Sequence, residues 1–351
     1  MGIIRSKFGN TAEGQKVSVI TMVNKNGVGV ELTEYGATLT ALTVPDRAGR
    51  IEDVVLGYED AMDYIRNTYF FGATIGRNGN RIGGAQVTLS NQTYRLDKNE
   101  NNNNLHSGFA GYDKVVWDVE ILEAEMTVKF SYHSPDGEQG FPGDFDITVA
   151  YTLTEENEIK IHYTGKSNAD TIANLTNHSY FNLAGHGSGD VLEQVMWIDA
   201  EAMTVIDEQS IPTGELRAVK GTPMDFTTPK KIGRDIAADY EQLRLVKGYD
   251  HNYVLNNQNG QVRKVAQVTE EKSGRMMEVY TDCVGMQLYT GNFIGDGTIG
   301  KEGKIYGKHS GFCLETQFYP DANHHEHFPS SILKAGALYD TTTIYKFSIK
   351  E

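Results

Sequence analysis

Cysteine is scarce in this sequence. Only Cys283 and Cys313 occur among 351 residues, too few for the disulfide framework of a small secreted protein. A chain of this length can bury roughly three quarters of its unfolded surface, so its core needs no covalent cross-links. We therefore expect two reduced thiols in a cytoplasmic protein. A secreted protein with one incidental disulfide is the alternative.

Positive charge is also in short supply. Lysine and arginine number 32 against 47 aspartates and glutamates, which gives a net charge of −15. No run of basic residues offsets this balance locally, so nucleic acid and membrane surfaces are disfavoured as partners. The sequence has no apolar stretch of signal-peptide or membrane-spanning length. These features favour a cytoplasmic protein that binds neither nucleic acid nor a membrane.

Strict alternation of apolar and polar residues is abundant and predicts β-strands. It runs through residues 16–23 and 28–36, on either side of the turn "NKNG", and recurs in paired segments over 85–96, 144–165 and 261–282. Helical patterns are few and short, chiefly 58–67 and 233–243. We find no repeat, linker or shift in composition that marks a boundary. The sequence therefore predicts an all-β fold, a large antiparallel β-sandwich with few short helices, formed by a single domain over residues 1–351.

Four segments carry side chains suited to chemistry. "GRNGNRI" holds Asn80 and Arg81, "NLHSG" holds His106, "LTNHSYFN" holds His178, and "GFCLETQFYPD" holds Glu315. Histidine titrates nearest neutrality, arginine offers five fixed donors to a diol or an anion, and aromatic rings suit the apolar faces of a sugar. His106 ends the asparagine-rich segment 97–108, which we interpret as a surface loop.

Glu315 is the most informative carboxylate. Strand alternation places it with Cys313 and Gln317 on one face, opposite Leu314 and Thr316. A glutamate on a mostly apolar strand is costly unless it is paired or used. We therefore expect Glu315 to face a polar groove, where it has a functional role.

Zinc sites, serine-hydrolase sites and nucleotide-binding sites are disfavoured, because the sequence lacks the residue spacing that each requires. The segment "NHHEHF" gathers His324, His325 and His327 around Glu326, but it lacks the spacing of a zinc site and follows a segment that we interpret as a loop. No G-x-S-x-G elbow, phosphate-binding loop or dinucleotide fingerprint follows a strand. What remains is acid-base chemistry by histidine and carboxylate, without metal or cofactor.

Eight segments occur in a characteristic order: "GRNGNRI", "NLHSG", "YDKVVWDV", "DGEQGFPGD", "LTNHSYFNLAG", "YDHNYVL", "QLYTGN" and "CLETQFYPDA". In order and spacing they resemble the aldose 1-epimerase family, the galactose mutarotases, from about residue 30 to the C-terminus. The resemblance implies a β-sandwich of the galactose-mutarotase type with a sugar in an open groove. It departs from the family at Asn78 and Gly79, where we expect an apolar pair, and at Ser107, where we expect glycine.

The resemblance also implies roles for individual residues. Glu315 would be the general base, His178 the general acid and His106 a second histidine at the reacting end of the sugar. Asn80, Arg81, Asp250 and Gln287 match positions that hold sugar hydroxyls. The implied enzyme is an isomerase that interconverts the α and β anomers of free hexoses such as galactose and glucose. We expect it to be a monomer or a weak homodimer.

Such a reaction needs a proton taken from the C1 hydroxyl and one given to the ring oxygen. With Glu315 ionised and His178 protonated, kcat/KM should rise through the pKa of the carboxylate and fall through that of the histidine. Two alternatives remain at this stage. A glycoside hydrolase would use Glu315 and Asp250 as its two carboxylates. A non-catalytic sugar-binding β-sandwich would need Arg81, Asp250 and Gln287 alone.

Overall fold

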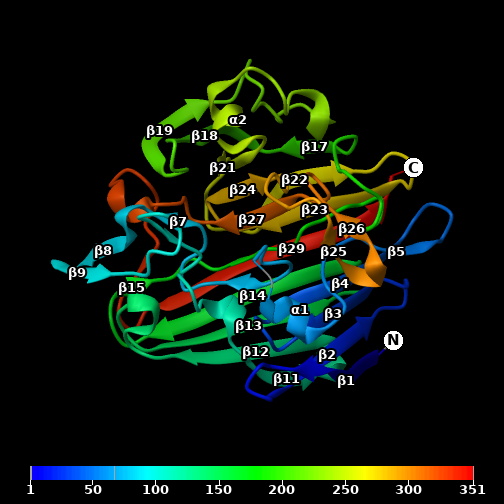
Figure 1. Cartoon of the computed structure of the whole chain (residues 1–351), viewed down its shortest axis with the longest axis horizontal. Coiled ribbons are helices and arrows are strands. Elements are labelled where there is room, and N and C mark those ends of the chain that lie inside the picture. The colour runs from blue at the N-terminus through cyan, green and yellow to red at the C-terminus, as the bar shows by residue number, and fades with distance from the viewer. Residues whose placement is uncertain (1, 67, 351) are drawn as a thin grey trace.

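The computed structural model describes residues 2–66 and 68–350. Most of its regular structure is strand, and the largest sheet has nine antiparallel strands (Figure 1). The order in this sheet is β11 (Asp118–Leu122), β12 (Thr127–Ser134), β13 (Phe145–Leu153), β14 (Glu158–Ser167), β29 (Leu338–Ile349), β23 (Arg275–Thr281), β22 (Arg263–Thr269), β17 (Val195–Ile198) and β20 (Lys230–Lys231). The C-terminal strand β29, red in Figure 1, lies in the middle and joins strands from the two halves of the chain.

Two further sheets have five strands each. The first is formed by β1 (Gly2–Asn10), β2 (Lys16–Val23), β3 (Gly29–Thr33), β4 (Thr38–Pro45) and β5 (Ile51–Asp53), in that order. The second has the order β19 (Pro212–Ala218), β18 (Ala200–Ile206), β21 (Asp250–Leu255), β24 (Gly285–Tyr289) and β27 (Cys313–Gln317).

Short strand pairs, two short α-helices and seven 3₁₀ helices of three residues each complete the regular structure of the described residues. The pairs are β6 (Thr74–Ile75) with β16 (Thr176–Asn177), β7 (Arg81–Ile82) with β10 (Asn104–Leu105), β8 (Gln86–Leu89) with β9 (Gln92–Arg95), β15 (Thr171–Ile172) with β28 (Ile332–Leu333), and β25 (Thr298–Ile299) with β26 (Ile305–Tyr306). The α-helices are α1 (Ala61–Arg66) and α2 (Glu241–Val246). Within the described part of the chain, neither helix nor any other has the length and apolarity needed to cross a membrane.

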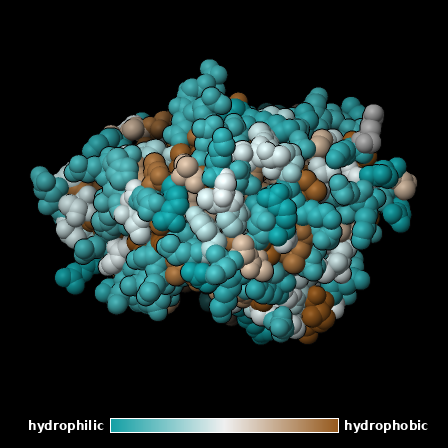
Figure 2. Space-filling view, turned by 90° about the horizontal axis from the view of Figure 1, so that it is seen from above, coloured by the Kyte–Doolittle hydropathy of each residue, from teal (hydrophilic) through white to brown (hydrophobic). Residues whose placement is uncertain are grey.

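The main core lies between the sheets. One continuous cluster of buried side chains includes Leu32 of the first five-stranded sheet, Leu314 of the second, and Phe130 and Val279 of the nine-stranded sheet. Alternation along each strand supplies these side chains from one face, which is why the sequence pattern specifies the layers. The expected all-β architecture with few short helices is confirmed. The face seen in Figure 2 is mainly hydrophilic, with hydrophobic side chains in small separate groups.

The four strand pairs expected from alternation are present as β2 with β3, β8 with β9, β13 with β14, and β22 with β23. The helix expected over 58–67 is α1, although residue 67 lies outside the described residues. The helix expected over 233–243 was wrong for most of its length. Backbone bonds from Ala238 to Asp235 and from Tyr240 to Ala238 form tight turns there, and α2 begins only at Glu241.

Candidate active site

A cavity of about 300 Å³ opens beside the second five-stranded sheet. That volume is at the lower end of the range for small-molecule pockets, roughly 300–1,000 Å³, and suits one monosaccharide. The cavity is lined by Thr68, Tyr69, Phe70, Asn80, Arg81, Glu100, Leu105, His106, His178, Tyr180, Asp250, Tyr289, Phe293 and Glu315.

Strand register explains how distant residues reach one face. Gln287 of β24 lies directly opposite Glu315 of β27, and Tyr289 lies opposite both Cys313 of β27 and Asp250 of β21. Directly paired residues of antiparallel strands point to the same side of the sheet. The other side carries core residues such as Leu314. The polar face expected for Cys313, Glu315 and Gln317 therefore exists, although all three side chains are buried.

His178 enters the cavity from the end of β16. Its backbone N–H donates to the carbonyl of Ala73, and its own carbonyl accepts from Gly72. The ring stacks on Tyr180, with centroids 5.1 Å apart and an interplanar angle of 29°. The two backbone bonds thus position the main chain of His178, and Tyr180 supports one face of the imidazole.

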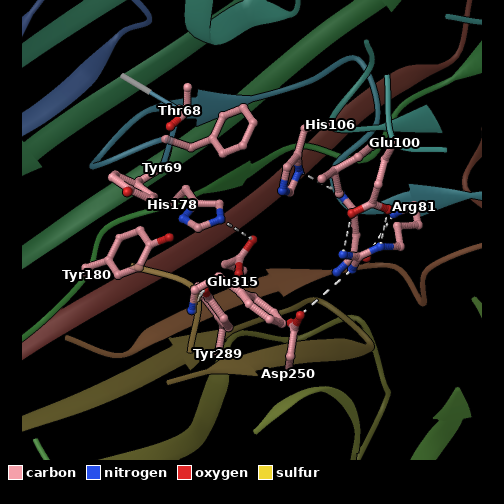
Figure 3. A pocket seen from close by; sticks show the side chains of 14 residues that line it. Thr68, Tyr69, Arg81, Glu100, His106, His178, Tyr180, Asp250, Tyr289 and Glu315 are labelled. Carbon is pink, nitrogen blue, oxygen red and sulfur yellow. Dashed lines mark hydrogen bonds and ion pairs between the residues drawn. The ribbon is translucent and has the colours of Figure 1, made fainter. Parts of the chain in front are cut away.

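Glu315, His178 and His106 point toward one another across the cavity (Figure 3). The Oε2 atom of Glu315 lies 3.7 Å from Nε2 of His178. That oxygen is buried and has no hydrogen-bond partner among the described residues. His106 packs edge-on against His178 at 5.3 Å between ring centroids. The structure thus brings together the three residues expected at the reacting end.

Burial sets the protonation of this cluster. Burial lowers the pKa of His178 to about 4, and burial together with the neighbouring His178 lowers that of His106 well below its ordinary value. Burial, helped by the charge of Asp250, raises the pKa of Glu315 well above its ordinary value. The expected order of the two titrations is therefore reversed. If the two groups act in catalysis, we expect the histidine to set the acid limb of a pH profile and the carboxylate to set the alkaline limb.

His106 is held in one tautomer. The backbone N–H of Asn80 donates to Nδ1 of His106 over 3.0 Å, so the neutral ring must carry its proton on Nε2. Donor atoms of His106, His178 and Glu315 all lie within 4.8 Å of one another, close enough to suggest a metal site. However, an Nε2 that carries a proton has no lone pair to give a metal ion. In this arrangement His106 is a hydrogen-bond donor.

Arg81 lies between two carboxylates (Figure 3). Glu100 accepts hydrogen bonds from its Nε and Nη2 atoms at 2.6 and 2.8 Å, and Asp250 lies 3.9 Å from Nη1. Burial raises the pKa of Asp250, and Arg81 opposes that shift. The bidentate pair fixes the plane of the guanidinium, so its remaining donors are directed.

Asn80 and Gln287 occupy different positions. Asn80 lines the cavity. Gln287 is not among the lining residues, but its Nε2 donates to Oδ1 of Asp250 over 2.7 Å. Three of the four residues expected to hold sugar hydroxyls line the cavity: Asn80, Arg81 and Asp250. The fourth, Gln287, does not line it but holds Asp250 in place.

Known proteins resemble this chain along nearly all of its length. The family model for aldose 1-epimerase matches residues 18–346. The chain belongs to the aldose 1-epimerase family. It is 43% identical to the galactose mutarotase of Bos taurus over 350 residues, 99% of each chain, and 36% identical to the aldose 1-epimerase of Haemophilus influenzae, covering 96% of this chain and 98% of the relative. A solved GalM/aldose epimerase homologue from C. elegans superposes with a TM-score of 0.88 at 30% identity, over 95% of this chain and all of that one.

In this member of the aldose 1-epimerase family, Ser107 and Asn78, two of the positions at which we expected other residues, bond to each other. Ser107 has a positive φ of 70°, a conformation that favours glycine. Its hydroxyl accepts from the backbone N–H of Asn78 at 2.7 Å and donates to the carbonyl of Asn78 at 3.1 Å. The two bonds hold the turn behind His106 against the segment that carries Asn80.

Sequence reasoning missed several residues that line or support the cavity. Glu100 lies in the asparagine-rich loop, which gave no sign of a role. Phe70 packs against both histidines at 4.8 and 5.6 Å between ring centroids. Phe293, half exposed, stacks on Tyr289. The only available signal for such residues was an aromatic side chain close to a polar motif in the sequence. No periodic pattern around Phe70 indicates that it faces the cavity.

The histidines of "NHHEHF" bind protein groups. His324 contacts Asp321 at 2.6 Å, and His325 and His327 contact the carbonyl oxygens of Pro212 and Gly214 at 3.0 and 2.8 Å. The contacts of His325 and His327 hold the segment against β19. His324 ends a short 3₁₀ helix (Ala322–His324) and residues 325–330 lie in no helix or strand, which agrees with the interpretation of this cluster as part of a loop.

Proposed function

We propose that this protein is an aldose 1-epimerase that interconverts the α and β anomers of free aldohexoses such as galactose and glucose. The observation that carries the proposal is the pairing of a buried carboxylate and a buried imidazole, Glu315 and His178, in a cavity of monosaccharide size. The relatives named above, a galactose mutarotase and an aldose 1-epimerase, support the same activity.

The reaction begins with two proton transfers. The carboxylate of Glu315 takes the proton of the C1 hydroxyl, and Nε2 of His178 gives a proton to the ring oxygen. The C1–O5 bond breaks as the C1=O1 bond forms, which leaves an open-chain aldehyde. Rotation about C1–C2 presents the other carbonyl face, and reversal of both transfers closes the ring. Each transfer contributes about 10²- to 10⁴-fold to the rate.

The pKa order of the site favours ring opening. The pair carries one proton in either of two arrangements, carboxylate with imidazolium or carboxyl with neutral imidazole. Burial favours the neutral arrangement because both charged forms lose solvation. Ring opening converts the charged arrangement into the neutral one, so the two transfers remove charge from the buried site. A buried imidazolium is also a strong acid, as protonation of an ether oxygen requires.

Other groups bind and orient the sugar. Arg81 and Asp250 present a donor fork and an acceptor from neighbouring points of the wall, an arrangement that suits adjacent hydroxyls. Asn80 adds an amide, and Gln287 holds Asp250. His106 donates its Nε2 hydrogen to an oxygen at the reacting end, where it stabilises negative charge without changing its own protonation. Tyr180, Tyr289 and Phe293 offer flat faces to the apolar side of the ring.

The alternative functions leave these contacts without a purpose. A hydrolase based on Glu315 and Asp250 would employ neither histidine. A non-catalytic sugar-binding protein would need the group around Arg81 but not a buried carboxylate with an unpartnered oxygen. Burying such an oxygen costs free energy, which is expected where a function requires it.

Polarimetry tests the proposal directly. The optical rotation of freshly dissolved α-galactose and α-glucose is followed with and without the protein at several protein concentrations. The protein should accelerate the approach to anomeric equilibrium in proportion to its concentration, without changing the final rotation. A rate equal to that of buffer with both sugars would refute the proposal.

A further inference from the structure

Cys313 lies directly behind the proposed acid. It begins β27, two residues before Glu315 and on the same face of the sheet, and it is fully buried. Its Sγ atom lies 3.6 Å from Nδ1 of His178, within hydrogen-bond range for sulfur. Neither sugar binding nor proton transfer, as described above, uses this thiol.

One strand therefore contacts both nitrogens of the imidazole. Glu315 lies 3.7 Å from Nε2, and Cys313 lies 3.6 Å from Nδ1. The two contacts orient the ring within its own plane, which stacking on Tyr180 does not do. A half-turn about the χ2 bond would keep the stacking but would exchange Nδ1 for a carbon and turn Nε2 away from Glu315.

The reaction places a demand on Nδ1. After Nε2 has given its proton to the ring oxygen, the imidazole must be neutral with a bare Nε2, because the same atom takes the proton back when the ring closes. The remaining proton must then be on Nδ1. A group that accepts a hydrogen bond from Nδ1 in both protonation states would enforce this tautomer.

We propose that Cys313 is a positioning residue whose sulfur accepts the Nδ1–H of His178 and so keeps Nε2 as the atom that exchanges protons with the sugar. The proposal rests on the proposed function for the direction of proton transfer. Sulfur is a weak acceptor, but within the buried site a weak bond suffices to distinguish two orientations of a ring that is already stacked.

The chemistry of a thiol suits this position. Burial, with the charges of Glu315 and Asp250, raises the pKa of Cys313 well above its ordinary value, so the thiol stays uncharged. A carboxylate at this place would stabilise the imidazolium and weaken it as an acid. An uncharged sulfur orients the ring while the pKa of His178 stays at about 4.

The decisive measurement is the tautomer of His178, read from the ¹⁵N shifts of the ring in histidine-labelled protein near pH 7.5 and assigned by loss of the signal in His178→Asn. We expect a protonated Nδ1 and a bare Nε2. Cys313→Ala should populate both tautomers and lower kcat about three- to tenfold, as expected for one lost hydrogen bond, with KM changed less than about twofold. Cys313→Ser should restore the tautomer and most of kcat.

Cys283→Ala is the matched control, because Cys283 is also a buried free thiol, but its side chain bonds to Thr281 and Thr316 rather than to the ring of His178. It should leave the tautomer and kcat unchanged. A protonated Nε2 in the unmodified protein would overturn the proposal without any variant. Unchanged shifts and kcat in a folded Cys313→Ala protein would also overturn it. Either result leaves the proposed function standing if Glu315→Gln is inactive.

Discussion

The backbone N–H of Asn80 donates to Nδ1 of His106 over 3.0 Å, and this contact separates the work of two neighbouring histidines. His106 keeps its proton on Nε2 and acts as a fixed donor. His178 presents Nε2 to Glu315, and we propose that it exchanges protons with the sugar at this atom. On this proposal, two residues with the same side chain and with ring centroids only 5.3 Å apart have opposite tautomers and different roles.

The acid-base pair gives the first prediction. Glu315→Gln should nearly abolish mutarotation while sugar binding survives, because the amide keeps the shape and loses the base. His178→Asn should lower kcat at least about a hundredfold, the low end for a lost acid-base group. Polarimetry measures the rate and calorimetry the binding. Glu120→Gln, an exposed change on β11, should leave both unchanged, and a Glu315→Gln protein with half the normal kcat would remove Glu315 from its role.

His106 should affect the rate but not its pH dependence. His106→Ala removes a donor at the reacting end and should lower kcat about a hundredfold or more, whereas His106→Gln keeps an N–H group and should lose less. The pH profile of kcat/KM should still rise with an apparent pKa near 4, from His178, and fall at a pKa above the ordinary value of a glutamate. Because the pair is coupled, these values belong to the pair. Loss of the acid limb in His106→Ala would show that His106 titrates in the reaction.

The buried imidazole should also shape stability against pH. Since burial lowers the pKa of His178 from 6.5 to about 4, its contribution is complete above pH 6.5 and is lost as the pH falls toward 4, where only the unfolded chain takes up the proton. Between pH 7 and pH 5 this amounts to about 1–2 kcal/mol. Urea unfolding should show that the parent protein loses more stability over this interval than His178→Asn.

His133→Asn provides a control of opposite sign. A hydrogen bond with Asp146 raises the pKa of His133, which is exposed on β12. Its contribution is present at low pH and is lost as the pH rises through the raised pKa. This variant should therefore show a small relative loss of stability at pH 5. A larger loss between pH 7 and pH 5 in His178→Asn than in the parent would contradict the assigned shift.

Much of the fold follows from alternation in the sequence. The β13 and β14 segments, for example, were predicted because their core faces are strictly periodic. The helix prediction for 233–243 failed because the apolar residues of this segment face the core from tight turns. Turns have no regular spacing of buried residues, so the pattern in the sequence was misleading. No local pattern could show that the C-terminal strand β29 lies between β14 and β23, because that pairing joins distant parts of the chain.

The site was predictable where function leaves a local motif. Glu315 and His178 were recognisable from their own neighbours. Glu100 was not, because its role depends on a bidentate contact with Arg81 across the cavity. The order in which His178 and Glu315 titrate could not be predicted from the sequence either. Ordinary pKa values apply to solvated groups, and burial reverses the order of the two pKa values here. The sequence identifies His178 and Glu315 as candidates, but only their burial in the folded protein determines which of the two holds the proton.

Asp250 gives the last prediction, on substrate class. Arg81 is the one lysine or arginine among the described residues that line the cavity, and Glu100 and Asp250 already balance its charge. A phosphate would meet these carboxylates without a free cation, so the site suits an uncharged ring. Anomer exchange measured by magnetisation-transfer NMR should be faster with galactose and glucose than with glucose 6-phosphate at equal concentration.

Asp250→Asn tests two roles of Asp250: its contact with the sugar and its effect on the pKa of Glu315. It removes a charge-assisted hydrogen bond to the sugar, worth about 1.5–3 kcal/mol, and should lower kcat/KM roughly ten- to over a hundredfold with galactose and glucose alike. Because the charge of Asp250 helps to raise the pKa of Glu315, the alkaline limb should also move to lower pH. Asp340→Asn, an exposed change on β29, should do neither. An unchanged alkaline limb would separate Asp250 from the base, and faster exchange on the phosphorylated sugar would overturn the substrate class while leaving the roles of Glu315 and His178 intact.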